Sequence, residues 1–247
     1  MEKCFAFNIW DIDSAKAIID AAVLKNRMVF LQVSSKVFKK IDTKEFIECI
    51  KKYIDKKNAD VIVHLDHSKE LHEVFEAIEI GWDSVMFDGS ELDLKDNIWC
   101  TNQVIEKAQK KSVLVEAELG KIKGTEDDII EQEEETVGIH EVIEFLSEAH
   151  VDLLAVAIGT EHGQYKSHTP VVNHKLIEAI SEISDVPFVV HGGSELSDDK
   201  LKSLFVHSNV KKINISTDVK QAYRKALLEA FDGGLMEEQG FDATKIE

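Results

Sequence analysis

Strand-like and helix-like segments alternate along almost the whole chain, and this alternation constrains the fold more than any other feature of the sequence. Short runs of β-branched and aliphatic residues predict strands at residues 4–8, 28–33, 60–65, 84–87, 112–118, 153–158, 187–190 and 212–215. Segments with helical periodicity follow them at residues 14–25, 44–57, 69–80, 95–109, 137–148, 173–182, 198–205 and 219–230. Such alternation in 247 residues predicts an α/β protein, a single-domain (β/α)8 TIM barrel spanning residues 1–247.

A doubly wound open sheet is the alternative fold. It usually has a glycine-rich first turn, and the segment from Phe5 to Trp10 has none. Helix N-caps are predicted at Asp13, Thr43, Ser68 and Ser197. Two connections are longer than the others: residues 119–136, predicted to form a mobile, acid-rich loop after the fifth strand, and residues 159–172 after the sixth.

The charge balance limits the partners that the chain can have. Lys and Arg number 29 against 47 Asp and Glu, a formal net charge of −18, which argues against binding nucleic acid or an anionic membrane. Cys4, Cys49 and Cys100 show no paired spacing that would indicate disulfides or a cysteine zinc site. No signal peptide or membrane-spanning run is visible, so we expect a soluble, cytoplasmic protein.

Polar residues stand at the ends of all the predicted strands, where a (β/α)8 barrel carries its chemistry. The clearest case is VIVHLDH, residues 61–67, an apolar run that stops at Asp66 and His67, which are costly to bury without partners. A capping carboxylate beside a hydrogen-bonded histidine would explain this stretch alone. The same pattern of an apolar run ending on a polar residue recurs along the chain, which favours a functional site. The other strand-end residues are Asn8, Gln32, Ser34, Asp88, Glu118, His162, His191 and Asn214.

Three of the strand-end residues, His67, His162 and His191, indicate a metal site. Three imidazoles at one barrel mouth form a catalytic zinc site whose fourth position is open to substrate. The chain has ten histidines, and the other seven lie in predicted strand interiors, helices or loops and give no such signal.

Two turns near the C-terminal end indicate an anion site. VVHGGS, residues 189–194, runs from a strand into a glycine-rich turn, and KINISTD, residues 212–218, repeats the arrangement one strand later. Backbone N–H groups in such turns bind anions, and the loops after strands seven and eight commonly bind phosphate in this fold. A tight turn would explain Gly192 and Gly193 alone, but the two turns together favour a phosphate site.

With these motifs in place, the chain resembles the class II, zinc-dependent ketose-bisphosphate aldolases, the fructose- and tagatose-bisphosphate aldolase group. The motifs that carry the resemblance follow the family's order and spacing over nearly the whole chain: AFNIWD, HLDH, SVMFDGS, VEAELGKIKGTEDD, LAVAIGTEHGQY, VVHGGS and KINISTD.

The resemblance implies a role for each matching residue. His67, His162 and His191 would bind Zn²⁺, Asp88 and Glu118 would hold a second ion in some members, and a monovalent cation (Na⁺ or K⁺) would lie near the phosphate. Asp66 would be the acid/base at the aldehyde oxygen, and Glu126 would move the proton on the carbon next to the ketone. Residues at the dihydroxyacetone phosphate site would be Gly163, Gly192, Ser194, Asn214, Ile215, Ser216 and Thr217, while Asn8 and Ser34 would orient the ketose.

Departures from the family pattern fall on the half of the site that binds the acceptor aldehyde. Glu195 stands where the family usually has a glycine, and both ends of the chain are shorter than usual. The resemblance also implies a homodimer or homotetramer that takes a phosphorylated sugar as its substrate.

Three hypotheses about function follow. The first is a zinc-dependent aldolase that reversibly cleaves fructose or tagatose 1,6-bisphosphate, as in glycolysis, to dihydroxyacetone phosphate and an aldehyde such as glyceraldehyde 3-phosphate. The second is a dihydroxyacetone-phosphate-dependent aldolase with an unusual acceptor in a specialised pathway. The third is a sugar-phosphate-binding homologue without turnover, against which Asp66, Glu126 and the three histidines argue.

Overall fold

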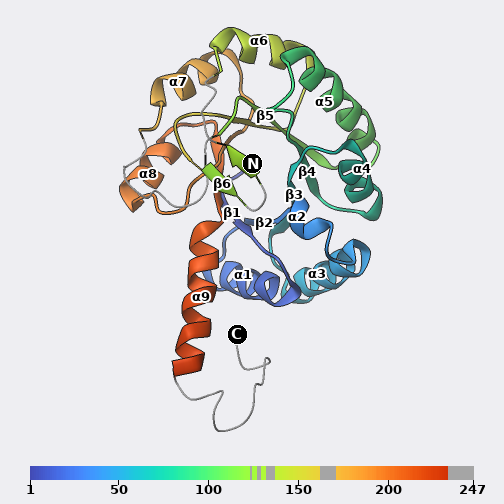
Figure 1. The fold of residues 1–247 in the computed structure, drawn as a ribbon, viewed down its shortest axis with the longest axis vertical. Coiled ribbons are helices and arrows are strands. Elements are labelled where there is room, and N and C mark those ends of the chain that lie inside the picture. Colours follow the sequence, from blue (N-terminus) through green and yellow to red (C-terminus); the bar gives the residue numbers. More distant parts are fainter. Residues whose placement is uncertain (123, 127–128, 132–136, 162–170, 233–247) are drawn as a thin grey trace.

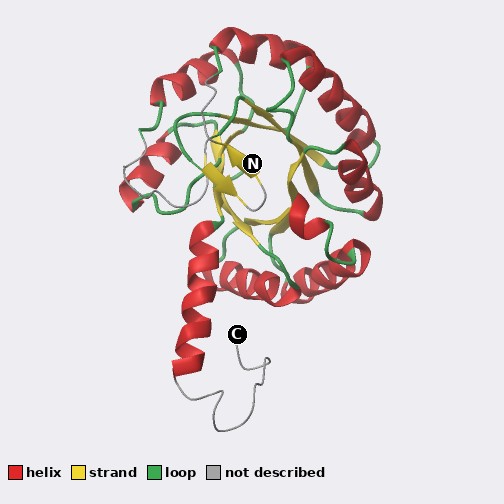
Figure 2. Cartoon of the chain, viewed as in Figure 1, coloured by secondary structure: helices red, strands yellow, loops and turns green. Residues whose placement is uncertain are grey.

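A closed barrel of parallel strands forms the centre of the molecule (Figures 1 and 2). The structure is a computed structural model that describes residues 1–122, 124–126, 129–131, 137–161 and 171–232. Going round the barrel, the strands are β1 (Cys4–Asn8), β10 (Val210–Ile215), β9 (Phe188–Val190), β8 (Leu153–Val156), β5 (Leu114–Leu119), β4 (Ser84–Phe87), β3 (Val61–Ser68) and β2 (Val29–Ser34). The predicted (β/α)8 barrel is confirmed.

Helices surround the strands, as Figure 2 shows. They are α1 (Ile12–Lys25), α2 (Ser35–Phe38), α3 (Thr43–Lys57), α4 (Leu71–Ile80), α5 (Leu94–Gln109), α6 (Ile139–Glu148), α7 (His174–Ile183), α8 (Asp198–Val206) and α9 (Thr217–Asp232). The outward faces of the strands pack against them in a core that includes the fully buried Trp82, Phe87, Phe145 and Phe188. The last helix, α9, extends away from the barrel wall (Figure 1).

Three of the four predicted helix caps are wrong. Asp11, not Asp13, caps α1: its carboxylate accepts from the Ser14 backbone N–H, and the Ser14 hydroxyl accepts in return from the Asp11 N–H. Asp42, not Thr43, caps α3, and its carboxylate accepts from the Glu45 backbone N–H at 3.0 Å.

Ser68 does not cap a helix either, because it is still part of β3, whereas Ser197 caps α8 as predicted. In the first two cases the cap is an aspartate one or two residues before the predicted position, directly before the first helical residue, and its carboxylate accepts from a free N–H group of the first turn.

Two short elements were not predicted. The helix α2 fills the β2–α3 connection, and an antiparallel hairpin of β6 (Gly124–Glu126) and β7 (Ile129–Glu131) lies inside the expected loop at residues 119–136. The mobility of that loop stays a prediction.

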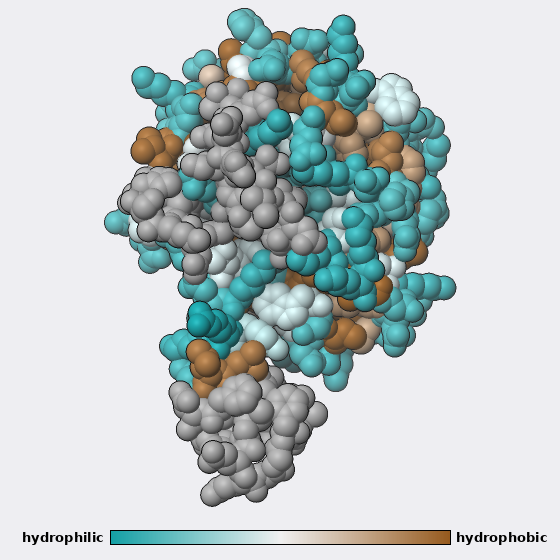
Figure 3. All heavy atoms as spheres, in the orientation of Figure 1, coloured by the Kyte–Doolittle hydropathy of each residue, from teal (hydrophilic) through white to brown (hydrophobic). Residues whose placement is uncertain are grey.

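Polar side chains dominate the coloured part of the face in Figure 3, which agrees with the high content of charged residues. Within the described part of the chain, no helix combines the length and the apolar character needed to cross a membrane.

Strand alternation divides the barrel interior into layers, because residues two apart on a strand point to the same side. Cys4, Phe30 and Leu153 belong to small apolar clusters near the starts of the strands. Further along the strands, towards their C-terminal ends, the interior has a fully buried polar layer made up of Gln32, His64, Ser84, Glu116 and Lys212. The last layer lies at the mouth of the barrel and contains Asn8, Ser34, Asp66, Glu118, His191 and Asn214.

Candidate active site at the barrel mouth

A local irregularity in β3 brings Asp66 and His67 into one site. Neighbouring residues of a regular strand point to opposite faces, yet both side chains are buried at the mouth. The β3–β4 register shifts between Leu65 and Ser68, and His67 has a positive φ of 47°. A bulge of this kind redirects side chains, and a non-glycine residue in left-handed backbone is a form of strain that gathers at functional sites.

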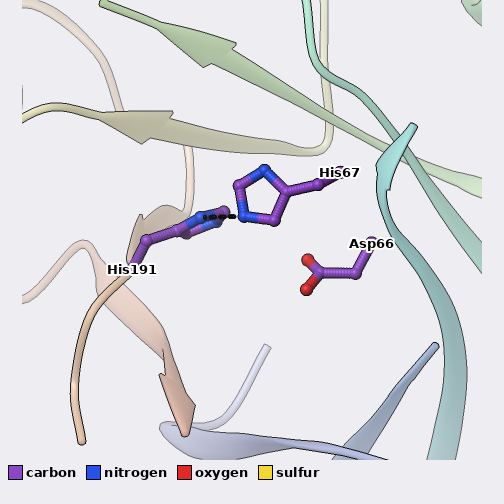
Figure 4. A group of neighbouring side chains, drawn as sticks. All are labelled: Asp66, His67 and His191. Carbon is purple, nitrogen blue, oxygen red and sulfur yellow. Dashed lines mark hydrogen bonds between the residues drawn. The ribbon is translucent and has the colours of Figure 1, made fainter. Parts of the chain in front are cut away.

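His67 and His191 face each other across the barrel mouth (Figure 4). The Nε2 atom of His67 lies 2.9 Å from Nδ1 of His191, and the rings are nearly perpendicular, with an interplanar angle of 88°. On its other side, His67 Nδ1 lies 3.3 Å from the Asp88 carboxylate and 3.6 Å from that of Glu118. Two imidazoles and two carboxylates from four different strand ends therefore meet in one buried place.

Two overlapping groups of side chains in the described residues have the geometry to hold a metal ion. Asp66, His67 and His191 form one group and His67, Asp88 and Glu118 the other, and within each the ligand atoms lie within 4.8 Å of one another. The Oε2 atom of Glu118 is buried and has no hydrogen-bond partner among the described residues. Imidazole nitrogens with buried carboxylate oxygens are a donor set that zinc accepts, so the residues present fit this metal.

Burial and charge set the protonation of these groups. Burial alone would lower the pKa of His67, but Asp66, Asp88 and Glu118 outweigh it and hold this pKa well above its usual value. Burial would raise the pKa of Asp88, but the hydrogen bond with His67 reverses this and lowers it. For Glu118, burial and the nearby Asp88 raise the pKa well above the usual value. These opposite shifts show that the carboxylates of Asp66, Asp88 and Glu118 stabilise a cation at the position of His67, while the repulsion between Asp88 and Glu118 is relieved by a cation or a proton.

A second buried layer supports the first from below. Glu116 accepts from Lys212 Nζ at 2.7 Å, and its other oxygen lies 3.0 Å from His191 Nε2. His64 Nδ1 lies 2.8 Å from the Ser84 hydroxyl. All of these side chains are fully buried. Burial and the charge of Lys212 lower the pKa of His64 well below its usual value, so this imidazole is neutral.

Gln32 connects Asp66 to the neighbouring strand ends. Its Nε2 donates to the Asp66 carboxylate at 2.7 Å and lies 3.4 Å from Asn8 Oδ1. Ser34 is the register partner of Asp66, and Asn8 is that of Gln32. The predicted residues Asn8 and Ser34 therefore lie beside Asp66, although the sequence did not show that Gln32 joins them.

The turns after β9 and β10 form the second part of the mouth. The Ser194 hydroxyl accepts from the backbone N–H of Ser216 at 3.1 Å, which ties the two turns together near the start of α9. Both polar side-chain atoms of Asn214, and the hydroxyl of Ser216, are buried without a hydrogen-bond partner among the described residues. Buried polar atoms of this kind indicate a ligand, because leaving them unsatisfied is costly. Ile215 ends β10 and Thr217 begins α9.

The position of Gly192 can be occupied by no residue type other than glycine. Its φ is +69°, and a Cβ at this position would collide with the backbone oxygen of Glu161. The turn after β9 therefore lies directly against the chain that leaves β8. Next to it, Glu195 also has a positive φ, of 60°, and its carboxylate accepts from the Gln221 side chain of α9 at 2.9 Å.

Some predicted site residues cannot be placed. His162 and Gly163 lie outside the described residues, and of Glu126 only the backbone, in β6, is described. Sequence reasoning missed Glu116 and Lys212, named Gln32 among the strand-end residues without giving it a role, and set His64 aside as unremarkable. Alternation offered a signal: Gln32, His64, Glu116 and Lys212 each lie two residues before a mouth residue on the same strand, so they point into the same barrel.

Comparisons with known proteins agree with this geometry. A sequence model described as fructose-bisphosphate aldolase class-II matches residues 3–246. The sulfofructosephosphate aldolase of Alkalicoccus urumqiensis is 34% identical over 224 residues, which cover 90% of this chain and 77% of that protein.

Two solved structures extend the comparison. The YdjI aldolase of Escherichia coli K12 superposes with a TM-score of 0.80 at 26% identity, covering 94% of this chain and 82% of that one. A putative fructose-1,6-biphosphate aldolase of Coccidioides immitis shows the same fold, with a TM-score of 0.86 at 22% identity, over 99% of this chain and 84% of that one.

Proposed function

Because the chain belongs to the class II fructose-bisphosphate aldolase family, we propose that it is a zinc-dependent lyase that reversibly cleaves a ketose 1,6-bisphosphate, of fructose or tagatose. The products are dihydroxyacetone phosphate and an aldehyde such as glyceraldehyde 3-phosphate. The observation that carries the proposal is the buried meeting of His67 and His191 with Asp66, Asp88 and Glu118 at the barrel mouth.

Zinc binding is proposed for His67, His191 and His162, with Asp88 and Glu118 nearby for a second ion. When bound there, zinc supplies Lewis-acid stabilisation of negative charge on substrate oxygens. The close contact of Gly192 with Glu161 supports the part given to His162, because it brings the residue just before His162 against the turn that carries His191. Glu116 holds His191 Nε2, which leaves Nδ1 directed towards His67.

Two carboxylates move protons in the proposed reaction. Asp66 takes the proton of the hydroxyl at the carbon that becomes the aldehyde, and returns it when the bond forms. Gln32 fixes the Asp66 carboxylate through one oxygen, and the neutral His64, 3.8 Å away, does not neutralise its charge. Glu126, on the β6–β7 hairpin, serves the proton on the carbon next to the ketone.

The 1-phosphate of the substrate is proposed to bind at the turns after β9 and β10. The backbone of Gly192 and Ser194 and the residues Asn214, Ile215, Ser216 and Thr217 line this place, and the unsatisfied atoms of Asn214 and Ser216 support it. Gly163 and a monovalent cation, Na⁺ or K⁺, complete the proposed phosphate site. Asn8 and Ser34 orient the other end of the ketose.

A second candidate substrate is favoured by one comparison. The relative from Alkalicoccus urumqiensis carries the name sulfofructosephosphate aldolase. A ketose 1-phosphate with a sulfonate at carbon 6 would use the same triose-phosphate half of the site, and only the acceptor product would differ. This substrate belongs to the specialised class of aldolase considered from the sequence.

A coupled assay for dihydroxyacetone phosphate tests the proposal. Fructose 1,6-bisphosphate, tagatose 1,6-bisphosphate and fructose 1-phosphate sulfonated at carbon 6 are supplied separately, each with zinc and with a chelator. Chelator-sensitive release from any of them supports the aldolase and identifies its substrate. If zinc-loaded protein released dihydroxyacetone phosphate from none of the three, the proposed activity would be wrong. Sedimentation of the same sample tests the proposed homodimer or homotetramer.

A further inference from the structure

A fully buried histidine, His64, lies directly below the proposed reacting centre. It precedes Asp66 by two residues on β3, so both side chains point into the barrel. Its register partners on the neighbouring strands are Gln32 and Ser84. The Nε2 atom of its ring is buried without a hydrogen-bond partner among the described residues. Such an atom requires an explanation, because leaving it unsatisfied is costly and no step of the proposed reaction uses His64.

The other ring nitrogen of His64 contacts a serine. Nδ1 lies 2.8 Å from the Ser84 hydroxyl, and Ser84 is itself fully buried. A hydroxyl can donate to an unprotonated ring nitrogen or accept from a protonated one, so this contact alone is compatible with either tautomer. The ring is neutral, since burial and the charge of Lys212 lower the pKa of His64 well below its usual value. One nitrogen therefore carries the proton, and the surroundings of the two nitrogens decide which.

Two carboxylates lie near Nε2 and determine where the proton is. Asp66 Oδ1 lies 3.8 Å from His64 Nε2, and Glu116 Oε2 lies 3.6 Å from it. A lone pair on Nε2 would face both negatively charged groups and be repelled, whereas an N–H group is attracted to both. Electrostatics therefore favour the tautomer with the proton on Nε2, in which the Ser84 hydroxyl donates to Nδ1. His64 is then a neutral donor that faces two carboxylates.

The imidazole of His64 and the amide of Gln32 approach Asp66 from the same layer. Gln32 Nε2 donates to Asp66 Oδ2 at 2.7 Å, and His64 Nε2 approaches the other oxygen, Oδ1. Both donors belong to the polar layer below the mouth, so they hold the carboxylate from beneath while it lies beside His67 and His191 (Figure 4). Donors at both oxygens restrict the rotation of a carboxylate, and efficient proton transfer depends on such a fixed geometry.

We propose that His64 is a positioning residue: its Nε2–H group holds the Asp66 carboxylate in the orientation in which Asp66 exchanges a proton with the substrate hydroxyl. The inference rests on the proposed function and extends it to a side chain to which the family resemblance gives no role. Glu116 is the second carboxylate facing this N–H group, and its other oxygen lies 3.0 Å from the proposed zinc ligand His191. One buried layer therefore fixes the position of both the base and a metal ligand.

Two substitutions of His64 separate the contributions of its two ring nitrogens. In His64→Gln the amide lies about as far from the backbone as Nε2, so a donor towards Asp66 remains. In His64→Asn the shorter amide lies about as far out as Nδ1, so it reaches Ser84 but not Asp66. Both variants keep a neutral polar side chain in the buried layer, and each is the matched control for the other. Thermal melts measure their folding, and atomic absorption measures their bound zinc.

Two reactions distinguish the positioning of Asp66 from general damage to the site. One is cleavage of the ketose phosphate that the coupled assay identifies, which needs Asp66. The other is exchange with solvent of the proton on the carbon next to the ketone of dihydroxyacetone phosphate. In the proposed reaction this exchange needs the metal and Glu126 but not Asp66.

The expected results differ between the two variants. We expect His64→Asn to lower kcat for cleavage by about 10- to 100-fold, with little change in KM or in the exchange rate. His64→Gln should recover most of this loss, because it keeps a donor towards Asp66. Wild-type cleavage by His64→Asn, an equal loss of cleavage and exchange in it, or no recovery in His64→Gln would overturn the proposal.

Nuclear magnetic resonance of protein with isotope-labelled histidine tests the contact without any turnover. The signals of His64 are those missing from His64→Gln, and their nitrogen shifts show which nitrogen carries the proton. We expect a neutral ring with the proton on Nε2, and a shift of this proton's resonance in Asp66→Asn, where the acceptor loses its charge. A proton on Nδ1, or a resonance that Asp66→Asn leaves unmoved, would overturn the proposal even in an active enzyme. The expected tautomer in a protein that neither cleaves nor exchanges would overturn the proposed activity alone.

Discussion

At the scale of single residues, the position of Asp66 explains why a carboxylate follows the apolar run of β3. It is buried beside His67 and His191, yet Gln32 gives one of its oxygens a hydrogen bond. Burying a carboxylate in this way is costly for stability, so its presence is better explained by chemistry than by folding.

Replacing Asp66 by asparagine tests its proposed role. The amide keeps the size and can still pair with Gln32, but it cannot accept the substrate proton. We expect kcat to fall by about 10²- to 10⁴-fold while bound zinc, measured by atomic absorption, stays at the wild-type ratio. A variant that cleaves at the wild-type rate would rule out Asp66 as the acid/base, and a variant that loses zinc would assign it to the metal instead.

Lys212 and Glu116 form a fully buried ion pair, since neither side chain is exposed at all. Removing one partner leaves the other charge uncompensated inside the barrel. We expect Lys212→Met to lower the free energy of unfolding by about 3–5 kcal/mol, measured by urea denaturation. The double variant Lys212→Met/Glu116→Gln should recover part of this loss, because it no longer buries an unpaired charge; an equal or greater loss would contradict the pairing.

The sequence identified single residues at the mouth better than the layer beneath it. Asp66, His67 and His191 were found because each follows an apolar run, and the structure brings them together as expected. Glu116 and Lys212 were missed because they lie within such runs, where a charge is normally read as surface exposure. Only closure of the barrel brings residues that are 96 positions apart within 2.7 Å.

At the scale of helices and strands, hydrophobic periodicity predicted the strands and helices of the barrel but not the residues at which the helices begin. The strands Cys4–Asn8 and Ser84–Phe87 were placed to the residue. The caps Asp11 and Asp42 were not, because competition between neighbouring polar residues is settled by local geometry. The α2 helix and the β6–β7 hairpin are too short to show a period, so no pattern in the sequence could have revealed them.

Glu73 holds three of these elements together at the β3 edge of the barrel. From α4 it accepts from the Ser35 hydroxyl of α2 at 2.7 Å and from the Ser68 hydroxyl of β3 at 2.9 Å, and it pairs with Lys39 at 2.9 Å. Burial alone would raise the pKa of Glu73, but these three partners outweigh it and lower the pKa from its usual 4.5.

Replacing Glu73 by glutamine should therefore destabilise the protein in a pH-dependent way. A lowered folded-state pKa means that the carboxylate stabilises the fold above about pH 4.5, and that this contribution disappears as the pH falls through the folded-state value. We expect a loss of about 1–2 kcal/mol at pH 7, shrinking below pH 4, from urea denaturation of both proteins. A difference that stays constant with pH would show that the charge of Glu73 is not what stabilises these elements.

At the scale of the whole molecule, closure of the barrel depends on the pairing of its first and last strands. β1 pairs with β10 from Cys4 and Lys212 to Phe7 and Ile215. The Cys4 thiol is buried within this seam and donates to the Lys211 carbonyl at 3.4 Å. Burial raises the pKa of this thiol to about 11. Both effects suppress its reactivity, because the exposed thiolate is the form that alkylating reagents attack.

Cys4 can therefore report on barrel closure in a chain where it is the remaining cysteine, with Cys49→Ser and Cys100→Ser. At pH 8 we expect iodoacetamide to label it only when β1 separates from β10, so the labelling rate should rise in parallel with the loss of far-ultraviolet circular dichroism in urea. Chains that retain only Cys49 or only Cys100, which are partly exposed, should react without denaturant. Rapid labelling of native Cys4 would mean that the β1–β10 seam opens on its own, because neither a buried thiol nor a pKa of about 11 permits the reaction while the two strands are paired.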